Sequence, residues 1–265
     1  MRKNMATNLA GGVPPVHQIA QQFGQFQCVR AVALAGSRGT AAHDPDSDYD
    51  LYLYSDEEIP LDFRRRLLGE HAEINNNFWE PGDEGIDRSS GIRLDIMYRS
   101  PGWIEDQLDR VLLRQEASIG YSTCFWFNVL HSEALYDRDG WYATLQQRTR
   151  APYPEGLRRA IVAKNWPILR RNQSSYRHQI DLALQRKDQF SIQHRTTALL
   201  ASFFDLWFAL QQTAHPGEKR LLTFLPPEWA ERVIRLIESS PDRRLAAIDA
   251  LLDPLDERLR EAQLL

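Results

Sequence analysis

Residues 31–54 read AVALAGSRGTAAHDPDSDYDLYLY, and the predicted fold is organised around this stretch. The opening apolar run, 31–35, is typical of a buried strand. Glycines at 36 and 39 permit positive φ angles and close backbone approach, which indicates a tight turn. Leucine and tyrosine then alternate over 51–54, a composition that favours a second strand. We therefore predict a strand, a glycine turn, a polar connection and a second strand.

Two carboxylates stand at the start of the second strand. Asp48 and Asp50 are two residues apart on an extended segment, so their side chains leave the same face. Neighbouring carboxylates repel each other unless positive charge lies between them, and hard oxygen ligands suit magnesium. The backbone amides and hydroxyl of Gly36-Ser37 can form an anion nest for phosphate groups. The stretch therefore predicts a metal site that faces a phosphate-binding turn.

A third carboxylate comes from residues 91–98, GIRLDIMY, which alternate apolar and polar side chains as a strand does. In such a strand Asp95 faces away from Leu94 and Ile96. If the strand pairs with the one that follows Asp50, three carboxylates could bind two magnesium ions about 3.5–4 Å apart. That arrangement suits nucleotidyl transfer, because the metals activate the attacking oxygen and balance charge on the leaving pyrophosphate.

Other interpretations of the same residues fit less well. The run Asp44-x-Asp46-x-Asp48 imitates the start of an EF-hand loop, but that loop needs Gly where this chain has Tyr49 and Glu where it has Ser55. The glycine turn lacks the spacing and the lysine of a P-loop. A purely structural interpretation remains, in which the aspartates cap a strand and Gly36 makes an ordinary turn.

Composition limits the class of protein. The chain has 265 residues, of which 43% are hydrophobic and 26% charged, as in ordinary globular proteins. A net charge of -4 argues against a protein built mainly to hold nucleic acid. Acidic residues crowd 44–62 and basic ones 148–195, which fits either a metal-binding half and a phosphate-binding half or two solvated surfaces.

The expected location is the cytoplasm, without membrane association. Two cysteines in unrelated contexts give neither a disulfide framework nor a zinc site. Residues 1–15 lack the apolar core of a signal peptide. The most apolar region, 198–210, contains Asp205 and is too short to span a bilayer.

Two domains are predicted, 1–150 and 151–265, because the pattern changes from strands and helices to helices alone at the proline-rich linker 151–156. The first domain is expected to have helices at 16–24, 59–68, 103–113 and 141–148, with 71–84 as strand plus exposed loop; residues 121–136 fit a strand or a helix. The basic run at 64–66 is interpreted as a solvated helix face. The expected helices of the second domain are 157–171, 175–187, 189–212, 227–238 and 245–263.

The motifs Gly36-Ser37, Asp48-Tyr-Asp50 and Asp95 resemble the signature of the nucleotidyltransferase (polymerase beta-like) superfamily, nearest to its minimal and aminoglycoside nucleotidyltransferase-like branch. The helical part is similar to an uncharacterised bacterial subgroup of this type through Asn165, His194-Arg195 and residues 215–220. The resemblance implies an α+β fold, a small mixed sheet with flanking helices followed by a helical bundle that closes the cleft. It also implies ATP or another NTP as donor and Mg²⁺ as cofactor.

Carried onto this chain, the resemblance gives Asp48 and Asp50 as ligands of both metals and Asp95 as ligand of the catalytic metal. Gly36, Ser37 and Arg38 would hold the phosphates. Lys219 would reach the triphosphate, or is a surface charge.

The acceptor implied by analogy is a small hydroxylated molecule such as an aminoglycoside-like compound. Modification of tRNA or of a protein side chain is a second hypothesis. A nucleotide-binding regulatory protein without turnover is a third. The sequence leaves the NTP base and the oligomeric state open.

Overall fold

A computed structural model of the chain describes residues 15–36, 48–69, 71–78, 80–87 and 90–265. It divides the chain into two compact units, which are described separately. Unit 1 takes the residues up to 105 together with 129–148, and unit 2 takes 106–128 together with 149–265. The chain therefore passes between the units three times. The predicted boundary after residue 150 lies close to the last of these passages, and the prediction contains no counterpart of segment 106–128.

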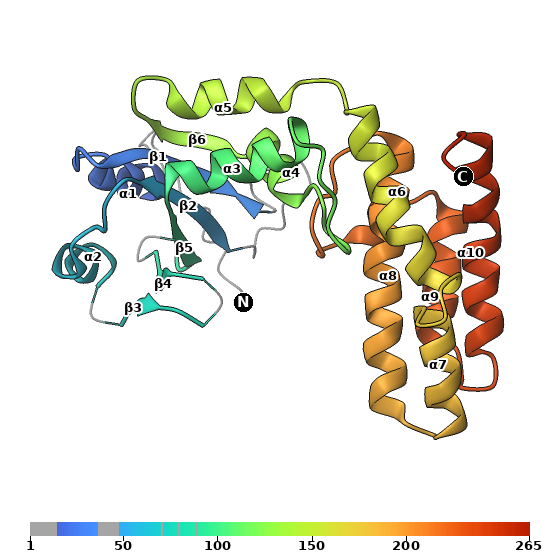
Figure 1. The fold of residues 1–265 in the computed structure, drawn as a ribbon. Helices are drawn as coiled ribbons and strands as arrows, with labels where there is room; N and C mark the ends of the chain where they lie inside the picture. The colour runs from blue at the N-terminus through green and yellow to red at the C-terminus, as the bar shows by residue number, and fades with distance from the viewer. Residues whose placement is uncertain (1–14, 37–47, 70, 79, 88–89) are drawn as a thin grey trace, which may run out of the picture. The chain divides into compact units, whose positions relative to one another are not determined.

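Unit 1 is built on a six-stranded mixed sheet with the order β3-β4-β5-β2-β1-β6 (Figure 1). Strands β2 and β5 pair in parallel, and the other neighbours pair antiparallel. The strands are β1 Val29–Ala35, β2 Tyr49–Ser55, β3 Glu73–Asn76, β4 Gly82–Ile86, β5 Arg93–Arg99 and β6 Glu133–Asp137. The predicted α+β class is confirmed.

Helices cover both faces of the sheet (Figure 1). On one face, helices α1 Pro15–Phe23 and α2 Leu61–Leu68 contribute to an apolar core that contains Leu51, Leu53 and Ile96. On the opposite face, Trp103 of α3 Pro101–Leu112 lies beside Arg99, and Trp141 of α5 Trp141–Thr149 contacts Tyr54. Because strand side chains alternate, the residues between the core leucines point to this second face.

The prediction for 71–84 was wrong in its second half. Instead of a strand and an exposed loop, this region forms β3 and leads into the antiparallel strand β4. Asp83 on β4 is fully buried. Segment 121–136, left open by its sequence, forms helix α4 Cys124–His131 followed by β6.

Asp83 is buried because Arg64 accompanies it. The Arg64 guanidinium donates to both Asp83 oxygens, through Nε at 2.8 Å and through Nη2. The Tyr98 hydroxyl and the backbone amide of Asn75 donate to the same carboxylate at 2.6 and 2.8 Å. The solvated basic face expected at 64–66 is therefore wrong for Arg64, which is buried, while its two neighbours are exposed. Burial of either charge requires the other.

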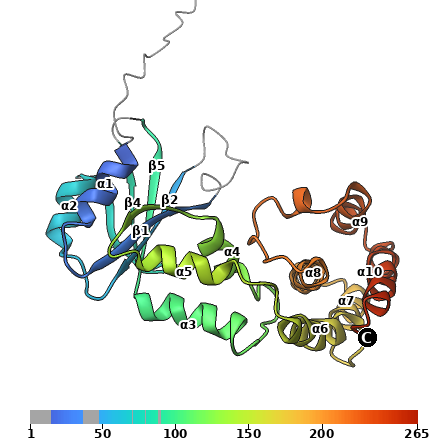
Figure 2. The same cartoon turned by 90° about the horizontal axis from the view of Figure 1, so that it is seen from above.

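Unit 2 contains five long helices: α6 Glu155–Arg170, α7 Tyr176–Gln185, α8 Gln189–Gln211, α9 Pro227–Glu238 and α10 Arg244–Glu261. A short 3-10 helix, η2 Leu221–Phe224, was not predicted. Helix α8 runs through the middle of this unit (Figure 2), and Phe203, Phe204, Trp207 and Phe208 on it are buried. None of the described helices is both long and apolar enough to cross a bilayer.

Candidate functional site

The strand register places two of the three predicted carboxylates side by side. Asp50 on β2 pairs with Asp95 on the parallel strand β5. Paired residues of neighbouring strands project from the same face, about 4.8 Å apart in the sheet. Asp48 directly precedes β2, two residues before Asp50, and is exposed. The sheet therefore gathers the acidic positions at one place, and their catalytic and metal-binding roles stay predictions.

The predicted glycine turn meets this pair. Gly36 follows β1 directly and has a φ of +67°, in the left-handed region that favours glycine. Any Cβ added to Gly36 would overlap the carboxylate of Asp50. Glycine at this position therefore allows the carboxylate to lie against the turn. Ser37 and Arg38, the other predicted phosphate ligands, lie outside the described residues.

A further carboxylate lies in the same row. Glu84 on β4 pairs with Asp95 on β5, so Asp50, Asp95 and Glu84 project from one face of three adjacent strands. The side-chain amide of Asn76 donates to Glu84 Oε1 at 3.1 Å, and Arg93 Nη2 lies 3.6 Å from Glu84 Oε2. Glu84 was not among the predicted site residues, because β4 was not predicted as a strand.

Negative charge is concentrated around Asp95. Burial raises the pKa of Asp95 above its ordinary value, and the charges of Asp50, Glu84, Glu80 and Asp48 raise it further, in that order. A bound cation would relieve this repulsion, and carboxylate oxygens are suitable donors for magnesium. Within the described ranges, however, no three Asp, Glu, His or Cys side chains converge closely enough to hold a metal ion. The donor chemistry fits magnesium, and binding would require the carboxylates to turn toward a common point.

Arg99 holds a second acidic side chain beside this row. It binds Glu80 through Nε at 2.9 Å and through Nη2 at 2.7 and 2.8 Å. Its guanidinium also lies 4.1 Å from the ring centroid of Tyr52 and 4.8 Å from that of Trp103. Glu80 is thus an ion-pair partner rather than a freely solvated loop residue. Trp103 is 37% exposed.

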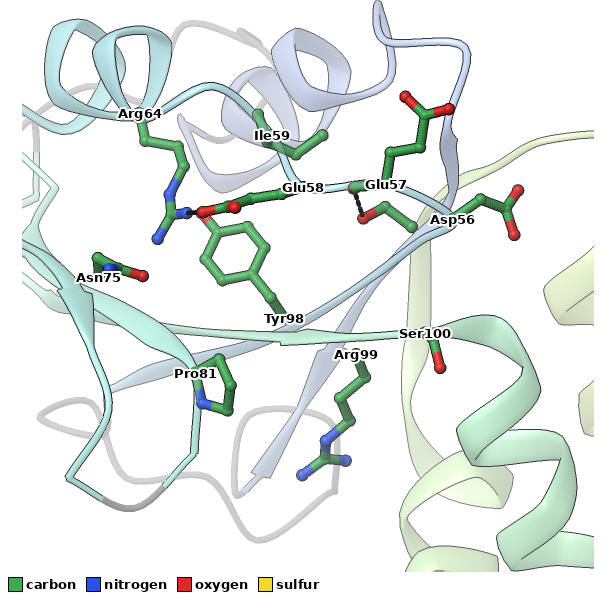
Figure 3. Close-up of a pocket in the computed structure, with 11 residues that line it drawn as sticks. Asp56, Glu57, Glu58, Ile59, Arg64, Asn75, Pro81, Tyr98, Arg99 and Ser100 are labelled. Carbon is green, nitrogen blue, oxygen red and sulfur yellow. Dashed lines mark hydrogen bonds and ion pairs between the residues drawn. The ribbon is translucent and has the colours of Figure 1, made fainter.

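A polar cavity of about 270 Å³ lies at the other end of the parallel strand pair (Figure 3). Ser55, the last residue of β2, and Ser100, which directly follows β5, line it. Arg64 and Arg99 also line it, and their side chains lie on opposite sides of β5 in Figure 3. Ser55 is five positions after Asp50, which corresponds to about 17 Å of strand. The cavity is therefore distinct from the carboxylate row.

The residues of unit 2 that the sequence analysis singled out differ in burial. Lys219 is exposed in the loop after Gly217. Asn165 is buried, accepts from the Gly120 amide at 3.0 Å and donates to the Ser118 carbonyl at 2.9 Å. His194 is exposed and stacks on Phe190 with 6.2 Å between ring centroids.

Asp205 and His215 fix the same part of segment 106–128. Ser122 donates to Asp205 through its amide at 2.9 Å and its hydroxyl at 2.6 Å. The His215 amide donates to Thr123 Oγ1 at 2.7 Å. Burial raises the pKa of Asp205 to about 6 and lowers that of His215 to about 4. These contacts tie the segment to the helices of unit 2.

Comparisons with known proteins connect the chain to a family without an assigned function. Residues 126–221 match the family described as "Domain of unknown function (DUF4037)". This match does not include the carboxylate row. Among curated proteins, none matches the chain.

One of the similar solved structures matches this chain over most of the chain's length. It is the crystal structure of a nucleotidyltransferase-like protein from Exiguobacterium sibiricum 255-15, with 12% sequence identity and a TM-score of 0.46. The similarity covers 94% of this chain and 77% of that chain.

Proposed function

We propose that unit 1 is a magnesium-dependent nucleotidyltransferase that moves a nucleoside monophosphate from an NTP, with ATP as the expected donor, to an acceptor hydroxyl. The observation that carries the proposal is the pairing of Asp50 with Asp95 directly beside the glycine turn. A Cβ at Gly36 of this turn would overlap the Asp50 carboxylate, so glycine leaves room for it. Acidic residues of neighbouring strands can share one face of a sheet by chance. In this structure the carboxylate of Asp50 also lies against the glycine turn.

Each residue has a defined task in the proposed reaction. The backbone amide of Gly36, together with Ser37 and Arg38, would bind and orient the phosphates. Asp48, Asp50 and Asp95 hold the cations. Bound magnesium supplies polarisation of the attacking oxygen and compensation of charge on the leaving pyrophosphate. Asp50 lies between the turn and Asp95 in the sheet, so it lies between the phosphates bound at the turn and the acceptor hydroxyl on the side of Asp95.

The proposal is tested by following the label from ATP labelled in its α-phosphate. The full chain is incubated with labelled ATP and magnesium in separate reactions that contain small hydroxylated amines and polyols, tRNA, or cell lysate. Covalent label on a small molecule, the leading acceptor class, supports the proposal directly, and label on RNA or protein supports it with a different acceptor.

The Asp50→Asn variant serves as the matched control, because it removes a charge while keeping the size of the side chain. If this variant transferred the label as fast as the wild type, the result would contradict the assigned site. Binding of ATP without transfer to any acceptor would favour a regulatory nucleotide-binding protein instead.

A further inference from the structure

The start of helix α10 lacks a capping side chain. The helix has 18 residues, and its N-cap residue, Arg243, forms no side-chain hydrogen bond to the first turn in the described structure. The first amides of a helix have no acceptor within the helix, so they bind a capping side chain, water or a ligand. A cation at this end is unfavourable, because the helix dipole places partial positive charge there. Asp242, directly before the N-cap, is exposed, and its carboxylate binds Ser240 and its own amide.

Arg244, the first residue of α10, is a buried cation without a carboxylate partner in the described part of the chain. It is 4% exposed. Its Nη2 donates to the Ser239 carbonyl at 2.8 Å and its Nη1 reaches Thr196 Oγ1 at 3.5 Å, whereas Nε has no hydrogen-bond partner among the described residues. A buried charge is unfavourable unless it is paired and hydrogen-bonded.

The guanidinium of Arg244 lies at the N-terminal end of the helix. Helical side chains lean toward the N-terminus of their helix. The hydrogen bond to Ser239, five residues earlier in the chain, places the guanidinium beside the connection between α9 and α10. Residues 240–243 of this connection are exposed. A ligand can therefore reach the first amides of α10 from solvent, with the guanidinium next to them.

The charged groups of the neighbouring helices do not compensate Arg244. Glu238 at the end of α9 is exposed, and Arg195 on α8 is a further cation. Asp249, the next acid along α10, is bound by Arg177, and Asp181 on α7 acts on the same arginine. Burial lowers the pKa of Arg244, and no acid of the described residues offsets this effect. The start of α10 therefore combines an uncapped helix end with an uncompensated cation.

We propose that the start of α10 is a binding site for a phosphate group. The phosphate oxygens accept hydrogen bonds from the first amides of the helix and a charge-assisted hydrogen bond from Arg244. One bound anion caps the helix and compensates the buried guanidinium. A tetrahedral anion suits the site better than a planar carboxylate, because the donors come from two separate groups. The inference concerns unit 2 alone and does not rest on the proposed function.

The test measures the unfolding temperature of the full chain at increasing concentrations of inorganic phosphate, with the ionic strength held constant by sodium chloride. Isothermal titration calorimetry gives Kd. Acetate serves as the planar anion, and pyrophosphate and a short single-stranded RNA serve as other sources of a phosphate group. The variants are Arg244→Met and, as a matched control, Arg260→Met in the last turn of the same helix.

For the wild type we expect the unfolding temperature to rise by about 3–5 °C at a phosphate concentration ten times Kd. Arg244→Met should abolish this rise, because it removes the charged donor. Without phosphate, this variant should unfold at the wild-type temperature or above it, because a buried unpaired charge has been removed. Arg260→Met, which removes the same charge at the other end of the helix, should keep the full rise.

A second variant tests the helix end without changing the buried side chain. Arg243→Asp places a negative charge and a hydrogen-bond acceptor at the N-cap, where aspartate is a preferred residue. Position 243 is exposed, so we expect the fold to be retained. The variant should unfold at a higher temperature without phosphate. Its Kd for phosphate should be about tenfold higher than that of the wild type, because the aspartate competes for the same amides.

Four results would overturn the inference. They are an unfolding temperature of the wild type that does not depend on phosphate, an equal effect of acetate, an unchanged rise in Arg244→Met, and an equal loss in Arg260→Met. Tighter binding of pyrophosphate or RNA that also depends on Arg244 would support the site and identify the source of the phosphate. None of these measurements involves transfer from ATP, so failure of the proposed function would leave them unchanged.

Discussion

The two faces of the sheet in unit 1 use the same strands for different purposes. Leu53 on β2 and Ile96 on β5 are fully buried against the α1 and α2 side. Asp50 and Asp95, on the same two strands, project to the opposite face. Neighbouring residues of one strand therefore belong either to the core or to the face of the proposed chemistry. We expect substitutions only one residue apart to affect stability in one case and activity in the other.

The largest effect is expected for Asp50→Asn on the charged face. A catalytic metal contributes several kcal/mol to stabilising the transition state, so weakening its site should reduce transfer about 1,000-fold or more. The amide keeps the shape of the carboxylate, so unfolding in urea should occur at nearly the same midpoint as in the wild type. Transfer assays and urea titrations on the same preparation measure both quantities. Substantial remaining activity would contradict the division between the faces.

Asp83→Asn is expected to give the largest loss of stability. Asp83 pairs with Ile96 in the register, so it lies on the core face, where Arg64 would keep a buried charge without a carboxylate. Removing one partner of such a pair costs about 3–5 kcal/mol of unfolding free energy. Urea titration gives the value. The double variant Arg64→Met with Asp83→Leu should recover most of it, and failure to recover would point to the Tyr98 and Asn75 contacts instead.

Leu53→Ala should destabilise without changing the chemistry. Truncation of a buried leucine costs about 2–5 kcal/mol, because it loses apolar burial and leaves a cavity. Measured per folded molecule, transfer should be equal to that of the wild type within about twofold, which corresponds to less than about 0.5 kcal/mol. A loss of kcat at a temperature where the variant is fully folded would show that the two faces are not independent.

Gly36→Ala should destabilise less than Asp83→Asn or Leu53→Ala and should have a clear effect on activity. A left-handed alanine costs about 1–2 kcal/mol. Its Cβ would also have to displace the Asp50 carboxylate, because the two cannot occupy the same space. We expect a transfer rate between those of the wild type and Asp50→Asn, measured with labelled ATP. Normal transfer would separate the turn from the site.

Local sequence patterns predicted the elements whose own residues specify them. The apolar run of β1, the alternation of β5 and the amphipathic helices were found near their predicted bounds, and α9 was found at Pro227–Glu238 as expected. Strand β4, GDEGI, was missed because it has no apolar alternation. Its position depends on pairing with β5 and on the Arg64–Asp83 pair, whose members are 19 residues apart in sequence.

The candidate site shows the same limit. Spacing within the sequence indicated that Asp48 and Asp50 share a face, and alternation indicated the face of Asp95. That Glu84 stands next to Asp95 follows from the register between two strands, which no local pattern records. The buried role of Asn165 likewise depends on the backbone of residues 118–120, more than 40 positions away.

The two units alternate along the chain, and this has a practical consequence for producing one unit alone. Because residues 106–128 belong to unit 2, a protein cut after residue 150 would retain every described carboxylate of the row. Residues 106–128 would then lack the helices of unit 2 against which they pack. Ser122 and Thr123 would lose Asp205 and His215 as partners. We expect such a fragment to aggregate. A minimal version of unit 1 requires that residues 106–128 be excised and the flanking ends rejoined by a short designed turn.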